Sequence, residues 1–461
     1  MFETFLARKT IISAGIALIL LATFGFFLFH KLGAHPFIDW DEGIYAQVAS
    51  EALSQHHSLG FTYFGRPWLE KPPLPIWLAE LDFKIFGVTE FAARLPIALF
   101  ALGTLLVTYL LARRLFKSSA AALLSMASFF IMFNFLYYGF YFDFDVPITF
   151  FILLSVYAFI KSRDNQKFYY LFWAALGLGV LTKSLIGLLP LPIILIFSLA
   201  GGGVAFLKNK HFYYGAGLFL AIIAPWHIIQ SVKFGGAFWK TYLGYHVFDR
   251  FLQPLEGHGG GANFYLSLFR QNALFPLLSI LSAGYFLWRS LKHKYFRPIL
   301  ISAVFIFLFF TLAQTKREPY MAPLYPFLAI MFGVTLSDII NLAKPTWIRP
   351  VAIGVIILTF VWLGWQFNNF KLFRWGETPL PLDTKKVALE VAKNYPGVPL
   401  YTADLNLGGP AFSFYAGREV KIIDDAAAQQ PSFKKILNLR PLMHGQTRNL
   451  YKIDDYIYIG Q

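Results

Sequence analysis

Residues 39–45, Asp39-Trp40-Asp41-Glu42-Gly43-Ile44-Tyr45, and residues 69–74, Leu69-Glu70-Lys71-Pro72-Pro73-Leu74, share one polar stretch between long hydrophobic segments. Two acidic clusters and a lysine are costly beside apolar surroundings, and only 14% of this chain is charged. We therefore expect this stretch to hold a catalytic site at the outer face of a membrane, and most of the remaining chain to hold it there.

The composition is that of a polytopic membrane protein. Of its 461 residues, 57% are hydrophobic and 19% aromatic, and the mean hydropathy is +0.54, whereas soluble domains are about 45–50% apolar. The net charge of +15 does not indicate a nucleic-acid partner, because the basic residues fall in short clusters between apolar runs. The absence of cysteine excludes disulfides, zinc-thiolate sites and thiol nucleophiles.

The apolar runs predict the fold class. A helix needs about 20 apolar residues to cross a bilayer. The first run follows Arg8-Lys9 and precedes no small-residue cleavage pattern, so we expect a span and no cleaved signal peptide. We predict a mostly α-helical, polytopic protein with about eleven transmembrane helices, near 11–29, 91–112, 119–138, 145–160, 168–186, 187–206, 212–231, 271–288, 297–313, 320–340 and 350–367.

The charges between these runs predict the orientation. With the N-terminus in the cytoplasm, all five inner loops are basic, as the positive-inside rule requires. The outer segments, including the first loop (30–90) and everything after about 368, hold most of the acidic residues. We expect a bacterial inner-membrane protein with a cytoplasmic N-terminus and a periplasmic C-terminus.

Two outer regions are expected to be ordered. In the first loop, apolar residues recur at helical spacing over 41–53, where Asp39 or Asp41 is expected to cap the start, and a second helix is expected over 74–86, after two prolines. We expect both helices to lie in the plane of the membrane interface. The region 368–461 predicts a small periplasmic α/β domain, separate from a membrane domain over 1–367, with a helix at 384–395 and strands at 400–403, 420–423 and 450–459, the last turning at Asp454-Asp455.

Several acids are candidates for catalysis. Asp41 begins a predicted helix, where it serves either as a general base or as a helix cap, and its spacing favours neither. Asp145, beside Asp143, lies at the outer mouth of a predicted span, where ionisable groups are costly and often functional. Glu70 and His246 would make a pair of metal ligands if the fold brings them together.

The cations among these outer candidates outnumber the carboxylates. Lys71 follows Glu70 in a segment that, taken alone, favours a solvated turn over a phosphate site, and the alternative for Lys183 is that it extends its ammonium to the interface. Arg250 lies four residues after His246, hence on the same face of a helix. The run Gly257-His258-Gly259-Gly260-Gly261 suits a mobile lid or a weak anion-binding loop. Together with Lys316, this pattern predicts a phosphate, and its place at the bilayer edge suggests that the phosphate belongs to a lipid.

At these residues the chain resembles the GT-C glycosyltransferases, in the branch of the lipid A aminoarabinose transferases and the protein O-mannosyltransferase-like enzymes. Each matching motif is short, but they occur in the family's order over about residues 1–340. They are Asp41-Glu42-Gly43-Ile44-Tyr45-Ala46 with Glu51, Glu70-Lys71-Pro72-Pro73 with Trp77, Arg94-Leu95-Pro96, Asp145-Val146-Pro147, Leu181-Thr182-Lys183, Phe238-Trp239 with His246 and Arg250-Phe251, and Lys316 with Pro319-Tyr320.

The resemblance implies a polyprenyl-phosphate sugar donor, inverting transfer and no nucleotide cofactor. It implies catalytic roles for Asp41 and Asp145, and phosphate binding by Lys71, Arg250, Lys316 and Lys183. Glu42, Tyr45, Glu70, His258 and Tyr320 would line the cavity, and Glu70 and His246 are candidate ligands for a divalent metal. The region after the eleventh span is shorter than in the aminoarabinose transferases, so the acceptor is left open among lipid, glycan and protein.

We therefore predict a glycosyltransferase of the bacterial cell envelope, with a bilayer and a lipid-linked donor as its partners and no nucleic acid. The alternative is a transporter or flippase that uses the same charges as a path for an anionic or lipid-linked substrate. The sequence shows no repeated half with matched broken spans, and a long ordered first loop is unusual for a transporter.

Overall fold

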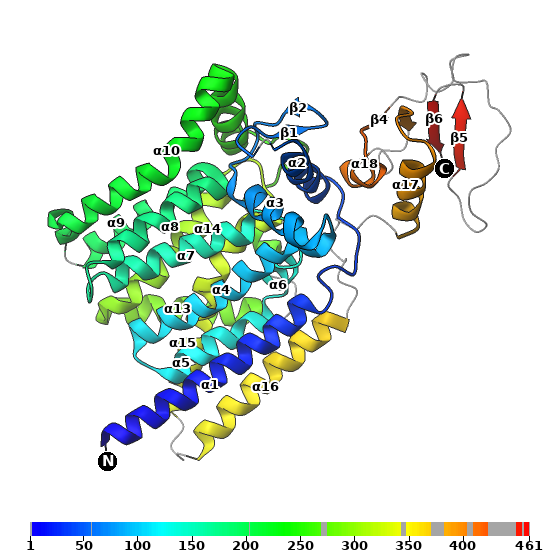
Figure 1. Cartoon of the computed structure of the whole chain (residues 1–461). Coiled ribbons are helices and arrows are strands. Elements are labelled where there is room, and N and C mark those ends of the chain that lie inside the picture. The colour runs from blue at the N-terminus through cyan, green and yellow to red at the C-terminus, as the bar shows by residue number, and fades with distance from the viewer. Residues whose placement is uncertain are drawn as a thin grey trace. The chain divides into compact units, whose positions relative to one another are not determined.

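The computed structural model describes residues 2–56, 58–201, 203–268, 274–342, 347–369, 382–402, 409–422, 449–453 and 456–460. The chain forms two compact units. Unit 1 comprises 1–30, 69–75 and 96–372, and unit 2 comprises 31–68, 76–95 and 373–461. Figure 1 labels most of the helices and strands of both units. Unit 2 thus groups most of the first loop with the C-terminal region, and the domain division at 367/368 stays a prediction.

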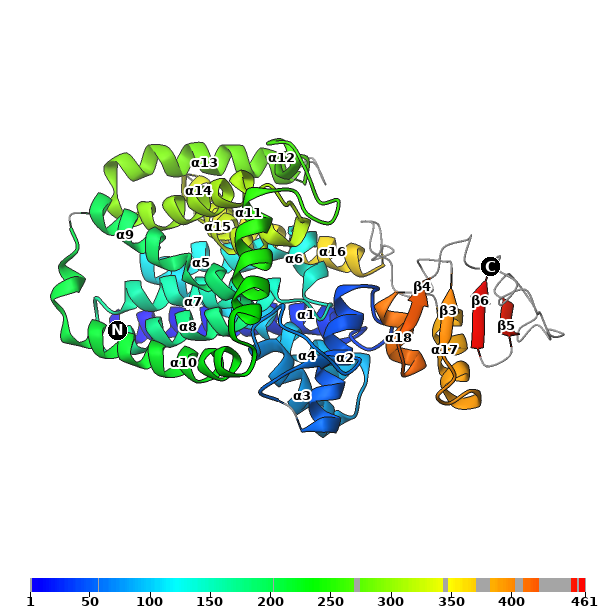
Figure 2. The same cartoon turned by 90° about the horizontal axis from the view of Figure 1, so that it is seen from above.

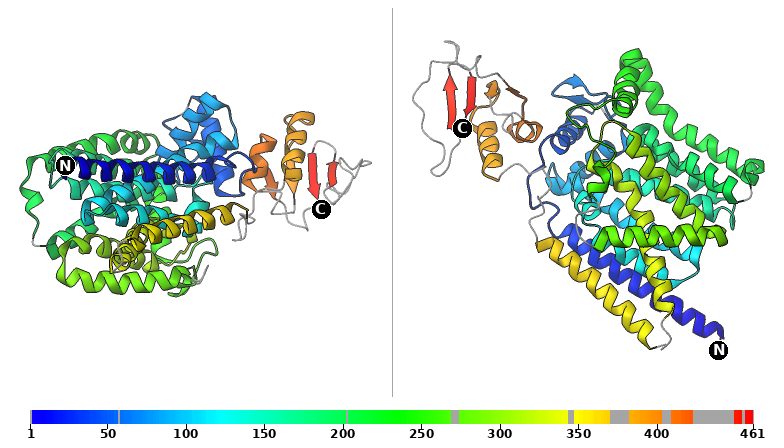
Figure 3. Two further views of the ribbon diagram at one scale, coloured as in Figure 1. Left: turned by 90° about the horizontal axis from the view of Figure 1, so that it is seen from below. Right: turned by 180° about the vertical axis from the view of Figure 1, so that it is seen from behind.

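Unit 1 is a bundle of apolar helices. Helix α8 lies against both α7 and α10, and α15 lies against α5, which is about 200 residues earlier in the chain (Figure 1). Figure 3 shows from behind that α1 and α16 run side by side. The elements of unit 1 are α1 (Phe2–Phe29), α4 (Glu90–Phe116, whose first six residues belong to unit 2), α5 (Ser119–Ala127), η1 (Ser128–Ile131), α6 (Phe133–Tyr138), α7 (Asp145–Lys161), α8 (Phe168–Lys183), η2 (Ser184–Leu188), α9 (Pro190–Gly201), η3 (Ala205–Lys208), α10 (Lys210–Trp239), η4 (Lys240–Asp249), α11 (Arg250–Leu252), α12 (Phe264–Leu268), α13 (Leu274–Lys292), η6 (Lys294–Phe296), α14 (Arg297–Leu312), η7 (Glu318–Leu324), α15 (Tyr325–Leu342) and α16 (Ile348–Asn369).

Small residues let these helices approach closely. A side chain at Gly333 of α15 would collide with the backbone of Ser125 in α5, and one at Gly187 would collide with the backbone of Gly179 in α8. Small residues at such contacts are typical of helix packing in membranes. The hydrophobic effect does not drive helices together in lipid, and close van der Waals contact takes its place.

Every one of the eleven predicted spans contains a helix. Within the described residues, six helices are long and apolar enough to cross a membrane, and three shorter apolar helices accompany them. The protein is thus a multi-pass membrane protein, and the count of eleven crossings stays a prediction. The six are Ile11–Phe29, Glu90–Phe116, Phe168–Leu188, Lys210–Leu252, Lys294–Leu312 and Glu318–Leu342.

Unit 2 combines two helices of the first loop with a small mixed sheet. The sheet has the strand order β4-β3-β6-β5, visible in Figure 2, with β3 parallel to both β4 and β6, and β5 antiparallel to β6. The two helices predicted over 41–53 and 74–86 are present. The elements are α2 (Asp41–Gln55), β1 (Thr62–Tyr63), β2 (Arg66–Pro67), α3 (Leu74–Phe86, whose first two residues belong to unit 1), α17 (Leu382–Asn394), β3 (Leu400–Thr402), α18 (Pro410–Ala416), β4 (Val420–Ile422), β5 (Asn449–Ile453) and β6 (Tyr456–Gly460).

The C-terminal elements occur where the sequence predicted them, with one addition. The helix predicted over 384–395 is α17, and the predicted strands are β3, β4 and the β5–β6 pair, while the turn expected at Asp454-Asp455 lies outside the described residues. Helix α18 was not predicted. It is only seven residues long, too short for its apolar spacing to stand out in the sequence.

Candidate active site

Unit 1 contains an amphipathic cavity of about 490 Å³. Most of its wall is apolar, and the polar side chains come from segments far apart in the chain. The wall is lined by Leu185, Ile186, Leu188, Leu189 and Pro192 from η2 and the start of α9, by Val247, Phe248, Phe251 and Leu252 from η4 and α11, and by Phe305, Phe309, Phe310 and Ala313 around the end of α14. The polar lining consists of Glu70, Lys71, Lys183, Ser184, Tyr242, His246, Arg250, Thr315 and Tyr320.

Local backbone features place several of these polar residues. His246 lies within η4, a π-helical segment between α10 and α11, and π-helical turns often mark functional sites. Ser184 has a left-handed φ of 53°, which ends α8 directly after Lys183. Pro72-Pro73 follows Lys71 and precedes α3, so the backbone at Lys71 is restricted.

Arg250 is held by two groups. Its Nη2 donates to both carboxylate oxygens of Glu256, at 2.6 and 2.7 Å, and its Nη1 lies 3.4 Å from the hydroxyl of Tyr320. Burial of the Glu256 carboxyl would raise its pKa, but the charges of Arg250 and Lys71, together with hydrogen bonds from Arg250 and Tyr245, hold that pKa below its ordinary value. Glu256 was not a predicted site residue.

Lys183 and Asp145 form an ion pair. The Lys183 Nζ lies 2.5 Å from Asp145 Oδ1, and the two side chains are 18% and 6% exposed. The same ammonium lies 4.8 Å from the centre of the Tyr320 ring, a favourable cation–π distance. Tyr320 therefore contacts both Lys183 and Arg250, and it lies between two of the predicted phosphate-binding cations.

Glu70 and His246 meet, with 3.8 Å between Glu70 Oε2 and His246 Nε2. Catalytic zinc sites use about three protein ligands. Among the described residues there is no group of three or more His, Cys, Asp or Glu side chains that could hold a metal ion. The pair thus supplies two ligands at most, and a metal role for Glu70 and His246 stays a prediction.

Lys316 does not itself line the cavity. Its Nζ donates to the carbonyls of Thr311 and Ala313, at 2.7 and 2.5 Å, at the C-terminal end of α14. A cation at this end of a helix satisfies carbonyls that lack helical partners and interacts favourably with the helix dipole. Burial lowers the pKa of Lys316. Its predicted role in phosphate binding is untested.

The glycine-rich loop is attached to the segment that contains Lys316. Gly259 pairs with Thr315 in a β-bridge, and the backbone N–H of Lys316 donates to the carbonyl of His258 at 2.8 Å. The Thr315 hydroxyl accepts from the Leu255 N–H and donates to the Gln253 carbonyl. The His258 side chain is exposed. Hydrogen bonds to the segment 315–316 therefore hold the chain on both sides of Glu256, and they involve the glycine-rich run 257–261 that is predicted to form a lid.

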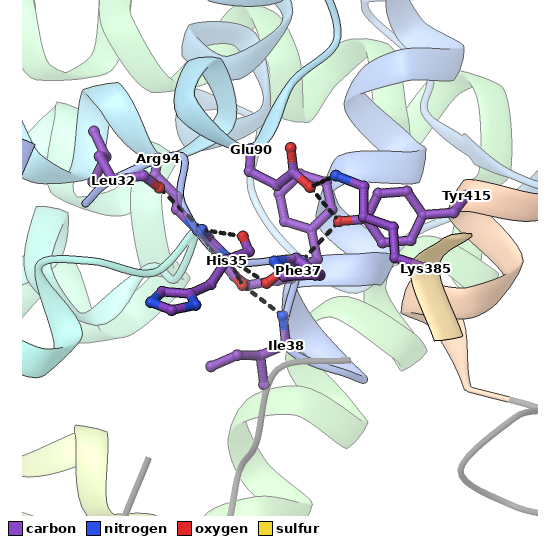
Figure 4. A network of polar contacts seen from close by, with 10 residues as sticks. Leu32, His35, Phe37, Ile38, Glu90, Arg94, Lys385 and Tyr415 are labelled. Atoms are coloured by element: carbon purple, nitrogen blue, oxygen red, sulfur yellow. Dashed lines mark hydrogen bonds and ion pairs between the residues drawn. The ribbon is translucent and has the colours of Figure 1, made fainter. Parts of the chain in front are cut away.

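Unit 2 contains the acidic cluster 39–42. Glu42 is buried and forms an ion pair with Arg94, and its Oε2 also accepts from the Ile38 N–H at 2.7 Å. Arg94 donates further to the carbonyls of Leu32, His35 and Pro36 (Figure 4). Tyr45 is also buried, with its ring edge against Trp68. In this unit, Glu42 holds the chain that leads into the acidic cluster.

Asp39 and Asp41 flank a strained residue. Trp40 has φ 65° and ψ −105°, which is an outlier for an aromatic residue, and outliers of this kind cluster at active sites. Asp41 is the first residue of α2 and is partly exposed. The expectation that Asp39 or Asp41 caps α2 is wrong, because Trp40 is the cap residue and α2 has no side-chain cap. Asp39 instead accepts from the Ala411 N–H of α18.

A second polar contact ties the C-terminal region into unit 2. Glu90 accepts from both Lys385 and the Tyr415 hydroxyl, and that hydroxyl accepts from the Phe37 N–H at 2.8 Å (Figure 4). These partners could not be predicted from local sequence patterns, since Phe37 and Tyr415 are 378 positions apart. Residues 37–42 are therefore held from both sides, by Arg94 and by α18.

Comparisons with known proteins agree with this fold. The family model for dolichyl-phosphate-mannose-protein mannosyltransferases matches residues 70–229. An uncharacterized protein of Aquifex aeolicus is 30% identical over 84% of this chain and 74% of its own length. The undecaprenyl phosphate-alpha-4-amino-4-deoxy-L-arabinose arabinosyl transferase 1 of Pseudomonas fluorescens is 30% identical over 69% of this chain, which spans 59% of that enzyme.

The fold is also that of a solved structure. The crystal structure of ArnT from Cupriavidus metallidurans bound to undecaprenyl phosphate matches with a TM-score of 0.72 and 19% identity, over 91% of this chain and 86% of that one. The fold and the relatives together define a membrane glycosyltransferase. The chain belongs to the GT-C family of these enzymes, which confirms the predicted class in place of a transporter.

Proposed function

We propose that this enzyme transfers one sugar from a polyprenyl-phosphate-linked donor to an acceptor on the periplasmic face, with inversion at the transferred carbon. The amphipathic cavity is the observation that carries this proposal. It combines apolar walls from η2, η4 and α14 with the cations Lys71, Lys183 and Arg250. A lipid chain requires the apolar walls, and its phosphate requires the cations.

The relatives support the same donor chemistry. The Pseudomonas fluorescens transferase and the Cupriavidus metallidurans structure are both described with undecaprenyl phosphate. Because this chain spans only 59% of the former, the donor's sugar and the acceptor are not carried over from it. A lipid, a glycan or a protein hydroxyl remains an acceptor compatible with the proposed chemistry.

In the proposed reaction, Asp41 takes the proton of the acceptor hydroxyl. The acceptor oxygen then forms a bond to the anomeric carbon, while the bond between that carbon and the donor phosphate oxygen breaks. The departing polyprenyl phosphate gains negative charge, which Arg250 and Lys71 stabilise more strongly than the charge of the intact donor. Asp145 holds Lys183, its ion-pair partner, at the cavity. We assign no step to a metal.

The test is the release of free polyprenyl phosphate from a panel of polyprenyl-phosphate sugars, with purified protein and a membrane extract as the acceptor. We expect one donor to be consumed by the wild type and not by Asp41→Asn, with Asp82→Asn in α3 as a carboxylate control that keeps its activity. Consumption of the donor at the wild-type rate by Asp41→Asn would contradict the assignment of Asp41 as the base. Failure of the folded wild type to consume any donor would contradict the proposed reaction.

A further inference from the structure

Glu256 stands out because it places an anion on Arg250, one of the cations proposed to bind the donor phosphate. Both oxygens of its carboxylate accept from one nitrogen of the Arg250 guanidinium, Nη2, and a phosphate also accepts charge-assisted hydrogen bonds from arginine. Lys71, a second proposed phosphate ligand, also acts electrostatically on this carboxylate. One internal carboxylate therefore interacts with two of the cavity's cations.

The two partners are unequally exposed. The Arg250 side chain is 12% exposed, whereas that of Glu256 is 43% exposed. Arg250 has a second contact in the Tyr320 hydroxyl, and it belongs to the cavity lining, which Glu256 does not. If an anion enters the cavity, Arg250 stays in place and Glu256 is the partner that can leave toward water.

The backbone restricts how Glu256 leaves. Glu256 has a left-handed φ of 55° and is followed by Gly257 at 74°, so the chain turns sharply here. On either side, Leu255 is bound to Thr315 and His258 to Lys316. Because the backbone is tied on both sides, rotation of the Glu256 side chain is enough to uncover Arg250, and no opening of the loop is needed.

We propose that Glu256 is an internal competitor of the donor phosphate, so that the lipid-linked phosphate displaces it from Arg250 and its return after transfer favours release of the polyprenyl phosphate product. The inference rests on the proposed function, since it takes the cavity as the donor site. It adds to that site an affinity-setting residue whose charge opposes binding of both donor and product.

The experiment measures binding of undecaprenyl phosphate to full-length protein in lipid nanodiscs, for the wild type, Glu256→Gln and Glu256→Ala. Exposed ion pairs contribute up to about 1 kcal/mol, so removal of the competing charge should tighten binding about fivefold. Binding of uncharged undecaprenol should not change. Asp164→Asn, which removes another exposed carboxylate paired with an arginine, is the matched control and should bind as the wild type does.

A double-mutant cycle tests whether the effect passes through Arg250. In an Arg250→Ala background, Glu256→Gln should no longer tighten binding. Unchanged or weaker binding of undecaprenyl phosphate by both folded Glu256 variants, with normal binding by the wild type, would overturn this inference alone. If the wild type binds undecaprenyl phosphate no better than undecaprenol, the proposed donor site fails and this inference with it.

Discussion

Arg94 and Glu42 form an ion pair with 2.8 Å between Nη2 and Oε2, and each side chain is only 3% exposed. All five guanidinium N–H groups have acceptors, because Nε and Nη2 both donate to Glu42 and the others donate to the carbonyls of Leu32, His35 and Pro36. The chain that precedes the acidic cluster is therefore held by one buried side chain, so position 94 should be unusually sensitive to substitution.

Arg94→Met should destabilise the protein by about 3–5 kcal/mol, since it leaves Glu42 buried without its cation. Arg94→Lys should destabilise the protein nearly as much, because an ammonium cannot reach five acceptors arranged around a planar guanidinium. Chemical unfolding in detergent measures both. Arg66→Met is the control, since Arg66 pairs with Glu419 at the surface and its loss should cost about 1 kcal/mol or less. Equal losses at both positions would refute the structural role of Arg94.

Asp39 should make stability depend on pH. Burial raises the pKa of Asp39, despite hydrogen bonds from the Ala411 and Trp40 N–H groups that favour the charged form. A carboxyl with a raised pKa in the folded state stabilises the fold at low pH, and that contribution is lost as the pH rises through the raised pKa. Asp39→Asn imitates the protonated form. The unfolding temperature of Asp39→Asn, relative to that of the wild type, should therefore increase as the pH rises. A difference that is constant with pH would contradict the buried environment of Asp39.

Gly43→Ala should destabilise unit 2. A Cβ at this position would collide with the backbone of Pro410 and Ala411 at the start of α18. Overpacking of this kind costs about 1–3 kcal/mol. Gly284→Ala, in α13, is the control, because nothing lies within 4 Å of the added Cβ and alanine favours a helix. Thermal unfolding should separate the two variants, and a neutral Gly43→Ala would mean that α18 does not lie against α2.

Lys316→Met tests whether this lysine stabilises α14 or binds phosphate. Its bonds to the Thr311 and Ala313 carbonyls predict a loss of about 1–2 kcal/mol in stability and little change in affinity for undecaprenyl phosphate. Lys71→Met, at the cavity, should weaken the binding of undecaprenyl phosphate and change the stability of the protein little. Weaker phosphate binding by a fully stable Lys316→Met would restore the role that the sequence predicted.

The local order of this protein could be predicted from its sequence. The apolar spacing after Asp41 and the two prolines before Leu74 indicate α2 and α3, because helix periodicity and proline geometry act over short distances. The partners of the acidic cluster could not be predicted in this way. Asp39 is one of the two residues predicted to cap α2, yet its partner Ala411 lies 372 positions away.

The candidate site shows the same limit. The sequence predicts Glu70 and His246 as a pair only if the fold brings them together, and the fold places Glu70 Oε2 3.8 Å from His246 Nε2. Glu256 was missed because a single exposed glutamate in a glycine-rich loop carries no signal until its partner Arg250 is known. Conversely, Lys316 has the residue type of a phosphate ligand, but its contacts lie with the end of α14.

The most direct test of the account is whether the unit 1 cavity recognises a lipid phosphate. We would measure the binding of undecaprenyl phosphate and of undecaprenol to the purified protein, for the wild type, Arg250→Ala and the control Lys233→Ala. We predict that the wild type and the control prefer the phosphorylated lipid, and that Arg250→Ala binds it about tenfold more weakly, the loss expected for a charge-assisted hydrogen-bond pair. Equal binding of both lipids, unaffected by Arg250→Ala, would contradict the assignment of this cavity as the donor site.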